Sequence, residues 1–425
     1  MIVPPWPPID PAAILLADDG PLAKSGTGAA EEELTHPSSS NPLPPLPRKR
    51  TKTVDLKSLP RLRSCDPPYW RRHLHWLLAL ALIPLIVSLL SGPDKASFVD
   101  RIKETFDRAT PEERDRIIER WETAQHEGDK SMERILPAFP DQRLRGAFLR
   151  STTKGHYYMA LLASVLYMAF FMFLAADGTT QPTHVLLYGL FTATIGVGFL
   201  LLVQLIASCT QDRMPVGANP VTLIILVFKL IAYSYSAALN PDNGFILSFL
   251  GFAAGVGLWE EFVKAVPLFW LRSSRYERSW RSMLICSLAS GAGFGIAEGI
   301  IYSSRYYNGI TGLEAYLVRF ISCVALHSIW SGSVAILLYI RHDLFDKIER
   351  WYQWILPILF VIGLPAVLHG LYDTCLKKDM NGVALLVAFA SFGYLAYLFS
   401  RLQTVDDRAA LKAMLREYER RKGLA

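Results

Sequence analysis

The sequence GFAAGVGLWEEFVKAVPLFWL, residues 251–271, is long and apolar enough to cross a bilayer, yet it carries Glu260, Glu261 and Lys264. A charged side chain at membrane depth costs about 2.5–3.5 kcal/mol or more, so such residues usually mark a site. On a helix, Lys264 lies one turn from both carboxylates and can pair with one of them. The cation favours the ionised form of one carboxylate, and the other can then act as a general base. An ion pair that only packs helices is the alternative.

Similar apolar runs recur from residue 74 to residue 400, and they decide the fold class. In lipid the backbone must satisfy its own hydrogen bonds, so these runs predict helices. We expect an all-α, polytopic transmembrane helical bundle in the cell membrane, with eight spans and an N-terminal hydrophobic segment, residues 71–92. That segment is short and contains Pro84, so it is either re-entrant or a ninth span. The runs are Leu74–Leu90, His156–Ala176, Val185–Ser208, Val221–Leu239, Phe245–Leu271, Met283–Ser303, Ala315–Ile340, Ile355–Leu376 and Val383–Ser400.

The net charge of +6 does not indicate nucleic-acid binding, because the Lys and Arg residues gather in short loops and tails that orient membrane helices. The basic loops are residues 272–281, 341–350 and the C-terminal tail, and we expect them in the cytoplasm. The opposite loops hold only Arg305, Lys377 and Lys378. The partners we expect are the lipid bilayer and a membrane-protein substrate.

Three polar segments flank or interrupt the predicted core, residues 156–400. Residues 1–70 are rich in proline and predict a disordered tail. Residues 93–155 predict a charged helical insert, in which Thr110, Pro111 and Glu113 form a capping-box signature. Residues 401–425 predict an amphipathic basic C-terminal helix.

Further ionisable residues lie in the next three apolar runs. Glu298 lies within a ladder of small residues, Ser287, Gly291, Gly295 and Gly299, which predicts close approach of another helix. His327 lies in the following run. His369 and Asp373 are one turn apart near the end of the run after that, so Asp373 can hydrogen-bond the imidazole.

Depth supports a single site. With a helical rise of about 1.5 Å per residue, Glu260, Glu298, His327 and His369 all lie roughly 17–24 Å from the cytoplasmic ends of their runs. Helices of alternating direction thus bring four such side chains to one level. Arg319 and Lys229 also lie within spans, and we assign them a structural or snorkelling role.

These motifs resemble those of the PrsW family of intramembrane proteases, which are related to the CAAX-prenyl and bacteriocin-processing proteases. The resemblance covers roughly residues 156–400 and rests on EExxK at Glu260–Lys264, FxxxE at Phe294–Glu298, the run with His327, and HxxxD at His369–Asp373. It implies cleavage of a membrane protein such as an anti-sigma factor. It also implies that Glu260 and Glu261 are the catalytic pair and that Glu298, His327 and His369 complete the site.

We therefore expect an intramembrane endopeptidase that activates water at a Glu/His site, with Lys264 and Asp373 in supporting roles. A Zn²⁺ ion held by Glu260, Glu298, His327 and His369 suits the ligand types, but their spacing matches no standard zinc motif. The residues slightly favour hydrolysis by glutamate and histidine alone. The alternatives are a proton-coupled transporter, in which the same residues relay protons, and a catalytically degenerate membrane scaffold.

Overall fold

A computed structural model of the chain describes residues 68–90, 98–127, 132–175, 180–210, 220–240, 242–273, 280–345 and 348–421. These residues form helices and turns without a strand among them, which confirms the expected all-α fold. The tail expected at residues 1–70 falls almost wholly outside them.

The α-helices are α1 (Pro68–Leu90), α2 (Phe98–Arg108), α3 (Pro111–His126), α4 (Met132–Ile135), α5 (Gly155–Leu174), α6 (Pro182–Phe191), α7 (Val197–Thr210), α8 (Pro220–Leu239), α9 (Phe245–Gly251), α10 (Leu258–Ser273), α11 (Trp280–Tyr302), α12 (Leu313–Leu317), α13 (Val324–Ile340), α14 (Ile355–Lys377) and α15 (Asn381–Arg421).

Within the described ranges, nine helical segments are long and apolar enough to cross a membrane. Eight of them match the runs expected after residue 155. The ninth is the N-terminal segment, where α1 is one helix of 23 residues that continues through Pro84. Its length is that of a span and not of a short re-entrant turn. The last span and the basic tail are also continuous, because α15 runs from Asn381 to Arg421.

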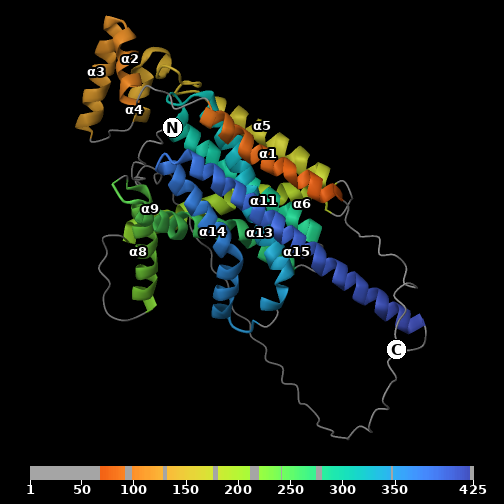
Figure 1. Cartoon of the computed structure of the whole chain (residues 1–425). Helices are drawn as coiled ribbons and strands as arrows, with labels where there is room; N and C mark the ends of the chain where they lie inside the picture. Colours follow the sequence, from red (N-terminus) through yellow and green to blue (C-terminus); the bar gives the residue numbers. More distant parts are fainter. Residues whose placement is uncertain are drawn as a thin grey trace, which may run out of the picture. The chain divides into compact units, whose positions relative to one another are not determined.

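Helix α13 occupies the centre of the bundle, where α11, α14 and α15 pack against it (Figure 1). Its sequence is apolar or small on every side, as expected of a helix without an exposed face. All but a few of its residues are buried. The small residues of α11 and α13 allow these two helices to approach most closely, and both carry residues of the predicted site.

The charged insert between α1 and α5 is helical and packs on the link between α11 and α12. The backbone N–H of Leu144 donates to Gly309 O (2.8 Å), and that of Gly309 donates to Leu149 O (2.9 Å). The predicted capping box is confirmed at the start of α3, where Thr110 N donates to Glu113 Oε2 (2.9 Å) and Glu113 N donates to Thr110 Oγ1 (3.3 Å). The insert therefore holds the connection between two site-bearing spans.

Contacts at the helix ends give the directions of α1, α5, α11 and α15. Helix α5 begins where His156 Nδ1 lies 2.9 Å from Asn308 Nδ2, at the end of the bundle that carries the insert. Beyond its other end, Thr180 Oγ1 donates to Ser282 Oγ (3.0 Å). Helix α1 begins at this second end, because the rings of His73 and Phe173 are 4.8 Å apart. The basic tail leaves from the same end, where Trp280 contacts Phe399 (5.6 Å).

Helices α6 and α8 both begin at the end of the bundle that carries Ser282. Helix α6 begins directly after Thr180, at the Ser282 end. Helix α8 runs antiparallel to α9, because Gly251 packs on Ala238 and Gly255 packs on Ser234. Its first residue, Pro220, therefore points toward the Ser282 end, as does the first residue of α6.

Candidate metal centre

Four spans bring their ionisable residues together in the middle of the bundle. Helix α10 supplies Glu260, Glu261 and Lys264, α11 supplies Glu298, α13 supplies His327, and α14 supplies His369 and Asp373. The structure thus brings together the residues that the sequence placed at one level of the bundle. Except for Glu298 and Asp373, which are partly exposed, these side chains are buried.

Turns of π-helix accompany three of these four spans. They are η6 (Phe252–Gly257), directly before α10, η7 (Ser303–Tyr307), directly after α11, and η8 (Val318–Cys323), directly before α13. A π-turn adds a residue to the helical repeat and often occurs at functional sites. Here each one shifts the register of a span next to its site residue.

Glycines set the distance between α11 and α13. A Cβ atom on Gly291 would collide with the carbonyl of His327, and one on Gly295 would lie 2.9 Å from His327 Cδ2. The predicted ladder therefore packs directly on the histidine. A Cβ on Gly257 would lie 2.5 Å from Ala366 O, and one on Gly370 would lie 2.6 Å from Ala253 Cα. This second contact brings η6 and the start of α10 against α14 beside His369.

Lys264 connects Glu261 on its own helix with His327 on α13. Its ammonium donates to Glu261 Oε1 (2.5 Å) and to His327 Nδ1 (2.9 Å). An ammonium group can only donate, so His327 Nδ1 accepts and the proton of the neutral imidazole is on Nε2. The rings of Phe294 and Trp330 lie 5.1 Å and 5.6 Å from the ammonium, in the range of cation–π contacts.

His369 has the opposite arrangement of its two nitrogens. Nδ1 donates to Glu261 Oε1 (3.0 Å), which leaves the lone pair on Nε2. That nitrogen lies 3.6 Å from Glu260 Oε2 and 3.4 Å from Asp373 Oδ2. The imidazole also stacks on Trp330, with ring centroids 4.3 Å apart, which fixes its plane.

Glu298 joins His327 to Arg319, a residue of η8. His327 Nε2 donates to Glu298 Oε2 (2.8 Å), and Glu298 Oε1 forms an ion pair with Arg319. The guanidinium lies 3.9 Å from the ring centroid of Tyr302 and is buried. Sequence analysis assigned Arg319 a structural or snorkelling role and missed this pair. The signal available was a single arginine in an apolar run at the level of Glu298.

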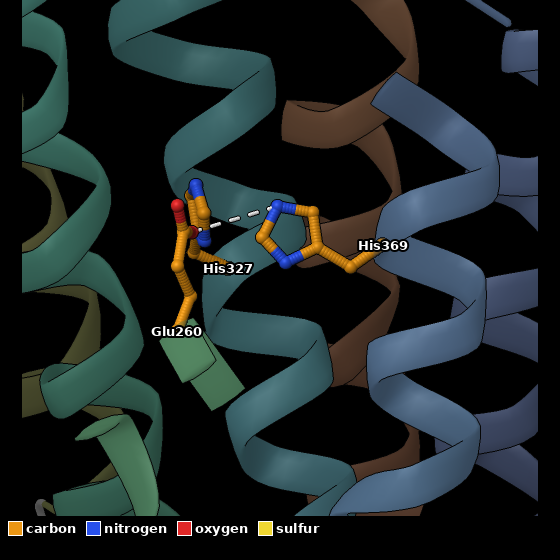
Figure 2. Close-up of side chains that lie close together, drawn as sticks. All are labelled: Glu260, His327 and His369. Atoms are coloured by element: carbon orange, nitrogen blue, oxygen red, sulfur yellow. Dashed lines mark ion pairs between the residues drawn. The ribbon is translucent and has the colours of Figure 1, made fainter. Parts of the chain in front are cut away.

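Glu260, His327 and His369 form a compact donor set. Each offers one ligand atom, and the three atoms lie within 4.8 Å of one another. Figure 2 shows a ring nitrogen of His369 directed at the Glu260 carboxylate, with the ring of His327 beside it. Glu260 Oε2 is buried and makes no hydrogen bond among the described residues. Glu298 joins this set only through its hydrogen bond to His327.

The charges around this donor set favour a divalent cation. Arg319 neutralises Glu298 and Lys264 neutralises Glu261. In the part of the chain that the structure describes, no lysine or arginine pairs with Glu260 or Asp373. Two imidazoles and a carboxylate are a ligand set that Zn²⁺ uses in hydrolases. The carboxylates on His369 Nδ1 and His327 Nε2 are the partners that orient metal-binding histidines. The residues therefore fit a metal ion, apart from the nitrogen that Lys264 engages.

Comparison with protein families agrees with this geometry. Residues 214–400 match the family model described as PrsW family intramembrane metalloprotease. This part of the chain is a PrsW-family domain, and it contains all seven predicted site residues. The match begins later than the residue 156 expected from the resemblance. No curated protein and no solved structure matched the chain significantly.

The match over residues 214–400 and the candidate spans indicate a multi-pass integral membrane protein with a hydrolase domain that acts on a protein substrate in the membrane. The family description also places metal-dependent chemistry ahead of the metal-free hydrolysis that the sequence slightly favoured. The buried Glu260, His327 and His369 group agrees with that description.

Proposed function

We propose that the chain is a zinc-dependent intramembrane endopeptidase whose ion is held by Glu260, His327 and His369. The observation that carries this proposal is the buried donor set within 4.8 Å, in which Glu260 Oε2 makes no hydrogen bond among the described residues. When bound, a Zn²⁺ ion would supply Lewis acidity for the scissile carbonyl and lower the proton affinity of a water molecule.

The surrounding side chains have separate roles in this proposal. Glu261 fixes the tautomer of His369, and Glu298 fixes that of His327. Asp373 is the acidic group nearest the outside, with 25% of its side chain exposed, whereas Glu261 and Lys264 are almost wholly enclosed. We therefore assign to Asp373 the transfer of a proton between the site and the leaving group. Its distance of 3.4 Å from His369 Nε2 suits this role.

The substrate we propose is a membrane protein with a scissile bond inside or just outside the bilayer, of the anti-sigma-factor type. The helical rise from the expected span ends puts the site near the middle of the bilayer, and the spans around it expose apolar side chains such as Leu250 and Val367. A substrate helix could approach along such faces. The cell membrane is the location we propose.

A proteomic comparison tests this function. Membranes containing the wild-type protein should yield cleaved fragments of a membrane protein that are missing with Glu260→Gln, which keeps the shape of the side chain and removes its charge. The double variant Glu260→Gln/Glu261→Gln should be equally inactive, while expression and membrane insertion are retained. Fragments formed at the wild-type rate by the double variant would refute the assignment.

A further inference from the structure

We infer that Lys264 is a built-in competitor of the metal ion, because its ammonium binds the same nitrogen of His327 that the ion would need. Contact between Lys264 and His327 and metal binding at His327 would then exclude each other. This inference rests on the proposed function, since it concerns the same donor set. It assigns Lys264 a role beyond balancing the glutamates.

The hydrogen bonds of His327 carry the argument. Nε2 donates to Glu298 (2.8 Å), and Glu298 is held in turn by the buried ion pair with Arg319. The remaining nitrogen, Nδ1, accepts from Lys264 Nζ (2.9 Å). Both nitrogens are therefore engaged, and a metal ion requires a free lone pair on one of them. The lone pair on Nδ1 is the one that can be freed without separating the histidine from its carboxylate.

The structure also offers the ammonium another acceptor. Glu261 Oε1 already accepts from Lys264 and from His369, while Glu261 Oε2 is buried without a hydrogen bond in the described part of the chain. Lys264 can give up His327 and bind both oxygens of Glu261. The backbone would stay in place, because Ser290 Oγ donates to Lys264 O (2.9 Å). Only the flexible lysine side chain has to move.

Lys264 should weaken metal binding in two ways. While the ammonium is bound to Nδ1, it blocks a ligand atom. Its positive charge also repels a cation in surroundings of low dielectric constant. Replacing Lys264 with a neutral side chain should therefore tighten metal binding. A lysine that only supported the fold would give the opposite result, because its loss would loosen the donor set.

The test is the zinc affinity of the purified full-length protein, measured in detergent by competition with a chelator of known affinity. We expect Lys264→Met to bind Zn²⁺ at least about tenfold more tightly than wild type, a change that corresponds to about 1.4 kcal/mol. Lys264→Arg keeps a cation beside His327 and should bind no more tightly than wild type. Lys229→Met, which removes a lysine from α8, is the matched control and should leave zinc affinity unchanged.

The outcomes separate this inference from the proposed function. A folded Lys264→Met variant that binds Zn²⁺ no more tightly than wild type would overturn the inference and leave the metal centre standing. If neither protein binds Zn²⁺, the metal centre fails as well.

A measurement on the wild type covers the case in which Lys264→Met does not fold. Zinc should shift the Nδ1 resonance of His327 in protein labelled with ¹⁵N-histidine, with the resonance assigned through His327→Gln. No shift at saturating zinc would overturn the inference.

Discussion

The two histidines of the centre lie in halves of the site with different charge balance. Around His327, the carboxylate of Glu298 is neutralised by Arg319, and Lys264 engages the second nitrogen. Around His369, Glu260 and Asp373 both approach Nε2, at 3.6 Å and 3.4 Å, without a lysine or arginine partner among the described residues. The His369 half is therefore ready to bind a cation, whereas the His327 half already contains cations of the protein.

This difference predicts which residues matter most for metal binding. A metal ion at this centre would gain most of its electrostatic stabilisation from Glu260 and Asp373 on the His369 side. In the arrangement we propose, His327 would complete the donor set only after Lys264 withdraws. Substitutions on the His369 side should therefore reduce metal binding strongly, and substitutions around His327 should adjust it in either direction.

The largest expected effect distinguishes the ligand His369 from its neighbour Asp373. His369→Ala removes a ligand and should lower zinc affinity by more than about a hundredfold, because loss of an outer-shell partner alone costs about 10–100-fold. Asp373→Asn keeps the shape of the side chain and should lower the affinity by no more than about that smaller range. Chelator competition on both purified variants measures the difference. Equal losses would mean that Asp373 is itself a ligand.

A second prediction concerns the packing that brings His327 to its place. Gly291→Ala forces a methyl group against the His327 carbonyl, and such overpacking costs typically about 1–3 kcal/mol. Gly393→Ala, in α15, meets nothing within 4 Å and serves as the control with the same gain in helix propensity. Thermal unfolding in detergent should show a lower midpoint for Gly291→Ala alone. Similar midpoints for the two variants would show that α11 and α13 are not in tight contact.

The smallest expected effect is on the stability of the insert between α1 and α5, outside the His327 and His369 halves of the site. Thr110→Ala removes the hydroxyl that accepts from Glu113 N, one of the two hydrogen bonds of the capping box of α3. It should destabilise that helix by about 1 kcal/mol. Hydrogen exchange in α3 should become faster, and zinc affinity should stay at the wild-type value. A change in zinc affinity would show that the insert is coupled to the metal centre through the link at Gly309.

The sequence predicted much of this arrangement because membrane burial makes charge expensive and helices impose regular spacing. The convergence of Glu260, Glu298, His327 and His369 followed from depth alone. The glycine ladder predicted the close approach of another helix to α11, which the structure identifies as α13. These predictions needed only the helical rise and the size of side chains.

Other features depend on tertiary contacts that spacing does not encode. Arg319, which pairs with Glu298, lies in the π-turn η8, and the sequence offered no signal for this change of helical register. The engagement of His327 Nδ1 by Lys264 depends on how α10 and α13 cross.

The most direct test of the central claim is zinc X-ray absorption spectroscopy on the purified, active protein. We predict about one zinc ion per chain, bound by two imidazole nitrogens and by oxygen, with one imidazole lost in His369→Ala. Chelation should remove the ion and the proteolytic activity together. An active preparation without stoichiometric metal, or a zinc ion without histidine ligands, would contradict a metal centre formed by Glu260, His327 and His369.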